Sequence, residues 1–365
     1  MIMKHGDWEV KKLGEVCDIL NGRNQKKVED INGKYPIYGS GGIMGYANDY
    51  ICKAGTTIIG RKGSINKPLY VDTEFWNVDT AFGLQPKECC HSRFLYYLCK
   101  SIDFARYDKG VTIPSLVKSD LLQIPVSIPS LEEQSRIVEE LDLLSNIIEK
   151  KRQQLSELDN LAQSIFYDMF GDPVTNEKGW EVKKLGEVCK TSSGGTPSKS
   201  HSEYYEGGII PWLRSGEVNQ MYISKTELFI TEEGLANSSA KWFPENTVVI
   251  AMYGATVGQV GILCKMMTTN QAICGIFPNE SFIPIYLYHF LLSKKEEYIK
   301  LASGGAQPNI SQNIIRDTLV CCPKKELQQL FAQKIEAIEK QKALIKQSIA
   351  ETEELFNSRM DYYFS

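Results

Sequence analysis

The decapeptide WEVKKLGEVC occurs twice in the chain, at residues 8–17 and again at residues 180–189, an offset of 172 residues. Ten identical residues at one offset indicate an internal duplication. TTIIGRKGS (56–64) then aligns loosely with TVVIAMYGA (247–255) at an offset of 191, and the GVTIPSL and GGAQPNIS segments align at an offset of 194. The offset grows by 22 residues, mostly before residue 247, so the copies share a frame and differ in their loops.

Size and composition predict a soluble protein with substantial cores. The 365 residues are 42% hydrophobic and 24% charged, which fits one large or two ordinary domains. The formal charge of −4 supplies no overall positive field, so any nucleic-acid surface has to be local. The N-terminal stretch lacks the apolar run of a signal peptide, and glycines interrupt the longest uncharged apolar stretch, residues 248–264. We therefore expect a cytoplasmic protein whose ten cysteines are reduced.

Both copies have the same order of predicted elements, namely short strands punctuated by Gly and Pro and then one long helix. Strands are predicted in IYGSGGIMGY, TTIIG and PLYV of the first copy and in VVIAMYG, VGILC and AICGIF of the second. Apolar spacing predicts short helices within residues 94–100 and 286–299. The predicted fold class is α+β, with two β-rich mixed α/β domains at residues 1–130 and 171–325 and long helices at residues 131–170 and 326–365.

The long helices carry matching heptad seams. The apolar positions alternate in steps of four and three, interrupted once by Lys151 in the first helix and once by Lys342 in the second; they are Ile137, Leu141, Leu144, Ile148, Leu155, Leu158, Phe331, Ile335, Ile338, Ile345, Ile349 and Phe356. Each helix packing only on its own domain is one interpretation. We favour mutual pairing as an antiparallel coiled coil, because a helix packed on a globular domain usually has a wider apolar stripe.

The register of that pair stays open at this stage. Placing Ile137 opposite Phe356 brings Lys151 opposite Lys342, and two buried ammonium groups are costly. A slip of one heptad, or snorkelling of the lysine stems to solvent or to carboxylates, relieves the conflict. A helix of about 40 residues is roughly 60 Å long, so such a pair would act as a ruler.

Charge is distributed unevenly along the chain. Residues 1–129 hold 17 Lys and Arg against 14 Asp and Glu, whereas residues 171–323 hold 13 against 15. The first domain is therefore mildly basic and the second is not. Basic side chains cluster at Arg23, Lys26 and Lys27 and around a Gly-Ser turn at Arg61, Lys62 and Lys67, with Lys199 and Arg214 in the second copy. Each cluster suits phosphate contact or an ordinary solvated surface.

Catalytic and metal-binding motifs are absent from the sequence. Four histidines without HExxH and ten cysteines without CxxC predict no zinc site. GTTIIGRK (55–62) departs from a P-loop at its lysine and the following hydroxyl residue, and the E-x-K tripeptides at residues 9–11 and 181–183 lack an acidic partner motif. No G-x-S-x-G occurs either. We therefore expect a non-catalytic chain without a metal or cofactor of its own.

These features together resemble the DNA specificity (S) subunit of type I restriction-modification systems, across essentially the whole chain. The resemblance rests on the duplicated WEVKKLGEVC, IYGSGGIMGY, GGTPSKSHSEYYEGGIIPWLRSGEV, GVTIPSL with GGAQPNIS, PSLEEQSRIVEEL and SIFYDMFGDP. It implies two target recognition domains that each read half of a split double-stranded DNA site, and two antiparallel helices that set the gap and dock two methyltransferase (M) subunits, with restriction (R) subunits in the full complex. S-adenosylmethionine, magnesium and ATP would belong to those partners.

Base readout uses Arg or Lys with guanine, Asn or Gln with adenine, and small hydroxyls near the groove. The loops that carry the resemblance supply these groups. The candidate DNA-binding residues are Arg61, Lys62, Ser64, Asn66, Lys67 and Thr112 in the first domain, and Thr196, Lys199, Arg214, Ser215, Tyr253, Thr256, Gln307 and Asn309 in the second. Three tryptophans, Trp76, Trp212 and Trp242, are expected in the core rather than stacked on bases.

Two rival classes of protein remain. A single-chain nuclease or methyltransferase requires an S-adenosylmethionine-binding glycine motif or an NPPY-like tetrapeptide, and neither occurs. A non-catalytic protein–protein scaffold with duplicated β domains is the alternative, because the chain is acidic overall and its second domain is not basic.

Overall fold

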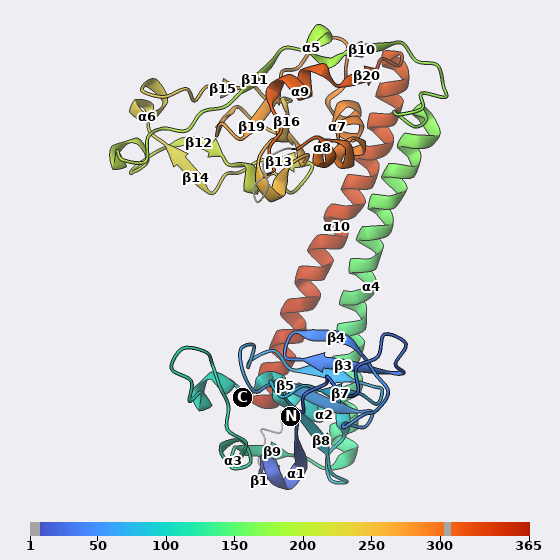
Figure 1. Ribbon diagram of the computed structural model, residues 1–365, viewed down its shortest axis with the longest axis vertical. Helices are drawn as coiled ribbons and strands as arrows, with labels where there is room; N and C mark the ends of the chain where they lie inside the picture. The colour runs from blue at the N-terminus through green and yellow to red at the C-terminus, as the bar shows by residue number, and fades with distance from the viewer. Residues whose placement is uncertain (1–7, 303–307) are drawn as a thin grey trace, which may run out of the picture. The chain divides into compact units, whose positions relative to one another are not determined.

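The computed structural model describes residues 8–302 and 308–365, which form two compact units. The first unit extends to Gln153 and includes Lys346–Ser365, and the second comprises Gln154–Ile345. Each unit therefore contains one β-rich domain together with one half of each long helix (Figure 1).

The first domain is built from three small sheets. A four-stranded sheet has the order β2-β8-β5-β6, a three-stranded sheet has the order β4-β3-β7, and β1 pairs with β9. The strands are β1 (Glu9–Lys12), β2 (Cys17–Asn21), β3 (Tyr35–Gly39), β4 (Gly42–Ala47), β5 (Thr56–Gly60), β6 (Leu69–Val71), β7 (Trp76–Asn77), β8 (Ala81–Pro86) and β9 (Pro125–Ile128); the helices are α1 (Leu13–Val16), α2 (Ser92–Ser101) and α3 (Lys118–Leu121). The strands and the helix predicted in this copy are thus present.

The second domain repeats this plan on a larger scale. Its sheets have the orders β11-β19-β16-β17-β13 and β14-β12-β18-β15, and β10 pairs with β20. The strands are β10 (Val182–Lys184), β11 (Thr191–Ser193), β12 (Ile210–Leu213), β13 (Tyr222–Ile223), β14 (Leu228–Ile230), β15 (Trp242–Phe243), β16 (Val248–Ala251), β17 (Val260–Leu263), β18 (Met267–Thr269), β19 (Ile273–Ile276) and β20 (Leu319–Cys321). The helices are α5 (Leu185–Val188), α6 (Glu232–Ala236), α7 (Pro284–Ser293), α8 (Lys295–Leu301) and α9 (Gln312–Asp317). The helical segment predicted within residues 286–299 is thus two helices that meet at Lys294.

The repeated decapeptide forms the same structure in both copies. Its first half is the strand that pairs with the last strand of the domain, Glu9 opposite Ile128 and Val182 opposite Cys321. Its second half is a one-turn helix whose third-position glutamate accepts the N–H of the capping residue, Glu15 from Lys12 at 2.6 Å and Glu187 from Lys184 at 3.2 Å. The pairing closes each domain just before its long helix.

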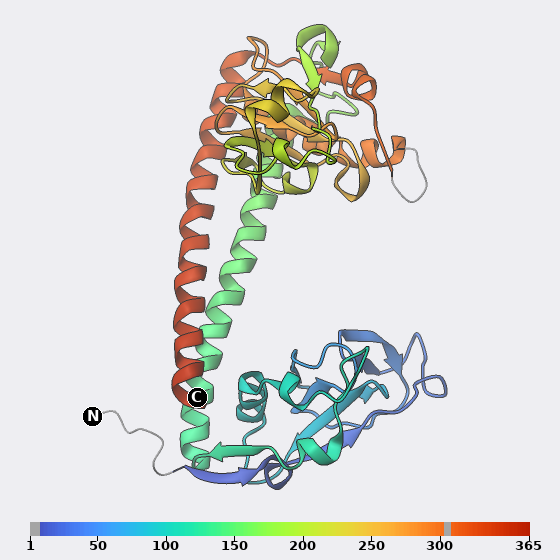
Figure 2. The ribbon, with the colours of Figure 1, turned by 90° about the vertical axis from the view of Figure 1, so that its left-hand side faces the viewer.

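The two long helices, α4 (Leu131–Phe170) and α10 (Lys325–Phe364), are 40 residues each and lie side by side (Figures 1 and 2). They run antiparallel, because contacts move backwards along α10 as they move forwards along α4. Glu140 accepts from Tyr363 at 2.5 Å, whereas Lys151, further along α4, donates to Ser348. The seam residues are buried or half-buried, and Ile137, Leu141, Phe331 and Ile335 are fully so.

In the observed register, Lys151 and Lys342 do not lie opposite each other; each lies about one heptad from the position opposite the other. In the first unit, Lys151 Nζ donates to Ser348 Oγ at 2.5 Å and to Thr352 Oγ1 at 3.1 Å. In the second unit, Lys342 Nζ lies 2.7 Å from Asp159 and 2.6 Å from Glu339. The structure therefore uses the heptad slip, and Lys342 also reaches a carboxylate of the other helix, so both expected ways around the lysine conflict occur.

Each domain is joined to its own long helix through one fully buried glutamine. Gln134 Nε2 donates to the carbonyls of Cys89 at 3.0 Å and Pro129 at 2.9 Å, and its Oε1 accepts the N–H of His91 at 2.7 Å. In the second copy, Gln328 makes the corresponding bonds to Ser281 at 3.0 Å, Pro323 at 2.9 Å and the N–H of Ile283 at 2.8 Å.

Candidate nucleic-acid interface

An exposed turn follows strand β5 in the first domain. Two backbone hydrogen bonds tie it to the segment before β9, from Gly63 N–H to the Pro114 carbonyl at 3.0 Å and from Leu116 N–H to the Arg61 carbonyl at 2.8 Å. Gly63 has φ +79°, and open space lies where a Cβ would stand. The glycine therefore lets the chain reverse in a left-handed conformation that other residues adopt at a cost. We call residues 61–67 the first turn.

The second domain has the same turn after strand β16. Gly254 N–H donates to the Pro308 carbonyl at 2.8 Å, and Ile310 N–H donates to the Met252 carbonyl at 2.9 Å. Gly254 has φ +66°, again with open space at the Cβ position. We call residues 252–258 the second turn. The matching bonds make Met252 the equivalent of Arg61, and they show that the loose alignment of these segments in sequence is correct.

In the first domain, every candidate DNA-binding residue has an exposed side chain. Five of them lie on the first turn and Thr112 lies on the segment bonded to it; they are Arg61, Lys62, Ser64, Asn66, Lys67 and Thr112. Arg61 Nη1 donates to the Asp79 carbonyl at 3.1 Å, and Asn66 Nδ2 donates to Asp103 Oδ1 at 2.9 Å. Lys62 and Lys67 form no ion pair with the described part of the chain.

In the second domain, three candidates come together at the second turn. Tyr253 is 41% exposed, and Asn309 is exposed and pairs with it in an isolated β-bridge. Thr256 Oγ1 donates to the Tyr253 carbonyl at 3.0 Å. Gln307 lies outside the described residues.

Three of the other four candidates lie near residues 269–272, which link them to the second turn: Thr196 bonds to Gln271, and Arg214 and Ser215 follow Leu213, whose carbonyl accepts from Asn270 N–H at 2.9 Å. The N–H of Met252 in the second turn donates to the Ala272 carbonyl at 2.8 Å. Arg214 is held by Glu217, with Nε 3.1 Å from the carboxylate, and by Glu227. The two glutamates oppose the charge of Arg214. Ser215 is half-buried beside it, and Lys199 is exposed.

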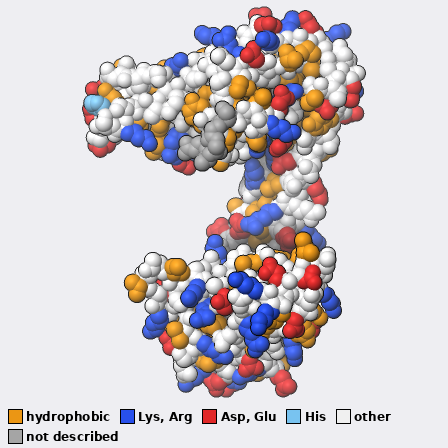
Figure 3. Space-filling view, viewed as in Figure 1, with side chains coloured by type: hydrophobic (Ala, Val, Ile, Leu, Met, Phe, Trp, Pro, Cys, Tyr) orange, Lys and Arg blue, Asp and Glu red, His pale blue; other side chains and the backbone are white. Residues whose placement is uncertain are grey.

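The backbone of Arg23 lies beside the segment that is bonded to the first turn, although the sequence singled Arg23 out only as part of a basic cluster. Its N–H donates to the Asn77 carbonyl at 2.9 Å, and the Thr80 carbonyl, three residues on, accepts from Arg61 N–H at 2.8 Å and Lys62 N–H at 3.2 Å. Arg23 and Arg61 thus flank one short segment although 38 residues separate them in the chain. Figure 3 shows Lys and Arg side chains spread over the visible face of this domain.

Two of the three tryptophans are core residues, as predicted. Trp76 and Trp212 are 7% and 4% exposed, and their indole N–H groups donate to the equivalent carbonyls of Arg23 at 3.0 Å and Gly195 at 2.9 Å. The prediction is wrong for Trp242, which is 37% exposed. The buried pair therefore positions the backbone at the start of each recognition region rather than offering a stacking surface.

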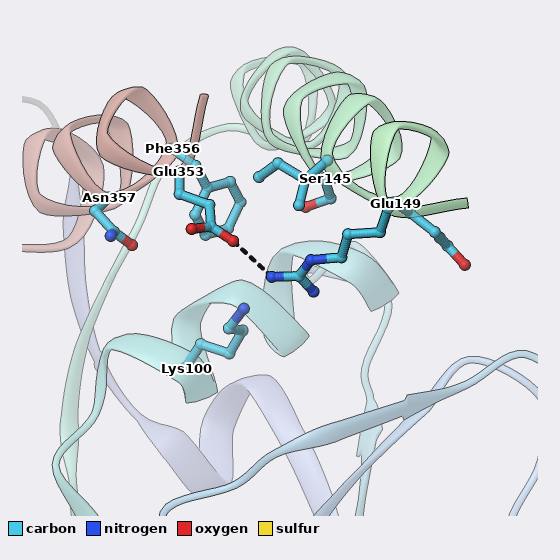
Figure 4. Close-up of a pocket in the computed structure, with 8 residues that line it drawn as sticks. Lys100, Ser145, Glu149, Glu353, Phe356 and Asn357 are labelled. Carbon is cyan, nitrogen blue, oxygen red and sulfur yellow. Dashed lines mark hydrogen bonds and ion pairs between the residues drawn. The ribbon is translucent and has the colours of Figure 1, made fainter. Parts of the chain in front are cut away.

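A pocket of about 520 Å³ in the first unit lies between α2, α4 and α10 (Figure 4). Lys100 reaches into it with Nζ 5.0 Å from the centre of the Phe356 ring, and burial lowers the pKa of Lys100. Arg152 pairs with Glu353 at 2.5 Å across the two long helices. The pocket belongs to the packing of the domain on the helix pair, because its charged groups come from the elements that meet there.

Nothing described in the structure forms a metal centre. Across residues 8–302 and 308–365, no group of three or more His, Cys, Asp and Glu side chains is placed to hold a metal ion. Among the helices within the same residues, none is long and apolar enough to cross a membrane.

A duplicated β-rich domain, a pair of long antiparallel helices and two equivalent exposed turns define a protein with an internal repeat. The family model for the type I restriction modification DNA specificity domain matches the chain twice, over residues 5–160 and 177–354, and the chain belongs to this family. It is therefore a type I restriction-modification specificity subunit.

Individual relatives agree with this assignment. The chain is 26% identical to the type I restriction enzyme MjaIX specificity subunit of Methanocaldococcus jannaschii, over 89% of this chain and 85% of that protein. It is 23% identical to a putative type I restriction enzyme specificity subunit of Haemophilus influenzae, over 99% and 95%. The crystal structure of an S subunit from M. genitalium has the same fold, with a TM-score of 0.63 and 15% identity over 100% of this chain and 98% of that one.

Proposed function

We propose that this chain reads a split, asymmetric DNA site, with each domain contacting one half of it. The observation that carries the proposal is the pair of equivalent turns, which share their backbone hydrogen bonds and differ in their side chains. One frame with two sets of side chains suits two different half-sites, because backbone contacts position a protein on DNA and side chains read base edges.

The helix pair would set the gap between the half-sites. A 40-residue helix is about 60 Å long, which corresponds to at most about 18 base pairs at roughly 3.4 Å each. The hydrogen bonds of Lys151 and the ion pair of Lys342 fix the register of the seam. A helix pair with a fixed register suits a spacer of constant length better than a pair whose helices slide along each other. The outer faces of the helices would then dock two methyltransferase subunits.

The chain would contribute recognition and no chemistry. In this proposal, methyl transfer, cleavage and translocation, with their S-adenosylmethionine, magnesium and ATP, belong to the methyltransferase and restriction subunits. The residues of this chain would bind and orient the duplex so that the partner reaches its target base. A positive field supplied by partners would also offset the net charge of −4.

The test is to express the chain with the methyltransferase encoded beside it and to map methylation in the host genome by single-molecule sequencing. We expect a bipartite motif that disappears when this chain is deleted. A stable complex whose methylation does not depend on this chain would favour the protein–protein scaffold instead.

A further inference from the structure

The two turns occupy the same position in the frame and differ sharply in charge. The first turn carries Arg61, Lys62 and Lys67, all with exposed side chains. The positions equivalent to Arg61 and Lys62 are Met252 and Tyr253, and residues 252–258 of the second turn include no charged side chain. Matching backbone hydrogen bonds fix the equivalence of Arg61 with Met252 and of Gly63 with Gly254. After these positions the second loop is one residue longer, because Ile58 pairs with Leu69 whereas Val249 pairs with Gly261.

The positive charge of the first turn is available to a ligand. Arg61 is hydrogen-bonded to a backbone carbonyl and not to a carboxylate. Two nearby carboxylates are already used inside the domain: Asp103 accepts from Asn66 at 2.9 Å and Ala105 N–H at 3.1 Å, and Asp108 accepts from the N–H groups of Gly110 and Ser115 at 2.7 Å each. These bonds lower the pKa of both carboxyl groups, which stay ionised, and neither forms an ion pair with Arg61, Lys62 or Lys67 in the described part of the chain.

The second turn offers neutral groups, and the exposed Lys199 lies outside it, before β12. The polar side chains at the turn are those of the exposed Tyr253 and Asn309 and of the half-buried Thr256. Lys295 packs its aliphatic stem against Gly258, and the next residue of its helix is Glu296. Arg214 is bound by two glutamates, as described above.

DNA binding through Lys and Arg releases counterions from the duplex, so each phosphate neutralised steepens the loss of affinity with salt. Neutral hydrogen bonds have no such effect. We propose that the first turn, together with Arg23, carries the salt-dependent phosphate contacts of this chain, and that the second turn binds its half-site through neutral contacts that salt does not weaken. This inference rests on the proposed function and adds a division of labour between the two domains.

The experiment measures Kd against KCl concentration for the complex with its methyltransferase, on a duplex that contains the mapped site and on one that lacks it. The first-turn variants are Lys62→Gln and Lys67→Gln, and the matched second-site variant is Lys295→Gln. A further variant, Tyr253→Phe, removes a neutral hydroxyl. All four positions are exposed or half-exposed, so folding should tolerate the changes.

We expect each first-turn variant to reduce the slope of log Kd against log salt by about 1. Lys295→Gln should leave the slope unchanged, and Tyr253→Phe should weaken binding by about 5- to 10-fold equally at every salt concentration. Equal slope changes in both domains, or none at the first turn, would overturn the division of labour while the bipartite motif still stood. Equal affinity for duplexes with and without the site would instead overturn the proposed function.

Discussion

Gln134 and Gln328 are equivalent residues that make the same three hydrogen bonds in the two copies of the repeat. Each lies in the first turns of a long helix and binds the chain that enters the helix and the chain that precedes the short helix α2 or α7. Both side chains are fully buried. One amide group thus couples the domain to the long helix, and its loss leaves two carbonyls and one N–H unpaired.

Replacing Gln134 with Met should therefore lower the free energy of unfolding by about 2–5 kcal/mol, because each buried polar group left without a partner costs about 1–3 kcal/mol. Urea denaturation measures the effect. Gln154→Met changes an exposed glutamine of the same helix and should shift stability by less than about 0.5 kcal/mol. Similar losses in both variants would show that the buried bonds do not couple the domain to the helix.

His289 should make the second unit sensitive to mild acid. The pKa of His289 is lowered to about 4, mainly by burial; Lys342 acts in the same direction and Asp159 in the opposite one. Within the described residues, Nε2 is buried without a hydrogen-bond partner. The imidazole is neutral in the folded state, so stability is full above pH 6.5, and it is lost as pH falls from 6.5 through about 4. The loss should reach about 3 kcal/mol.

His289→Phe keeps the ring contacts with Phe166 and Phe331 and removes the titrating group. The difference in unfolding free energy between this variant and the parent should grow as pH falls from 6.5 to about 4. A difference that stays constant over that range would contradict the assignment of the acid sensitivity to His289.

Gly63 should be required for the shape of the first turn rather than for packing. Its φ of +79° disfavours any residue with a Cβ, although the space around it is open. Gly63→Ala should cost about 1 kcal/mol of stability and reduce affinity for the target duplex, because the turn shifts. Gly41→Ala also enters open space but without a positive φ, and it is the matched control. If Gly63→Ala and Gly41→Ala reduced affinity equally, the backbone conformation of Gly63 would not explain the loss.

Lys151 should select the register of the helix pair. Lys151→Met removes a half-buried ammonium group together with its bonds to Ser348 and Thr352. A polar group in a seam fixes register at some cost in stability, so the variant should be at least as stable as the parent. The complex of this variant with its methyltransferase should methylate sites of altered spacing more readily. Thermal denaturation tests the stability, and methylation of a library of DNA sites with different spacer lengths tests the spacing preference. An unaltered spacing preference would mean that the register does not depend on Lys151.

The sequence predicted the long helices and some of the strands, because the signals for these elements are local. The heptad spacing from Ile137 and the run TTIIG each specify one element without reference to the rest of the chain. The register around Lys151 and Lys342 was not predictable, since two alignments of the same seam satisfy the apolar pattern and only the acceptors Ser348 and Asp159 distinguish them.

The loops that form the candidate interface were predictable from the sequence. Which of their charged side chains are paired within the fold was not. The backbone N–H groups of Arg23 and Arg61 both donate to carbonyls of residues 77–80. No pattern in the sequence predicts these bonds. Arg214 carries the residue type expected for phosphate contact, yet Glu217 and Glu227 bind it in the fold. Which charges remain available depends on tertiary neighbours, and these become visible only in three dimensions.

The most direct test of the account replaces residues 1–130 with the corresponding domain of a related specificity subunit and repeats the methylation mapping. The account predicts that one half of the bipartite motif changes while the other half, read by residues 171–325, stays the same. A motif that changes in both halves, or in neither, would contradict the assignment of one half-site to each domain.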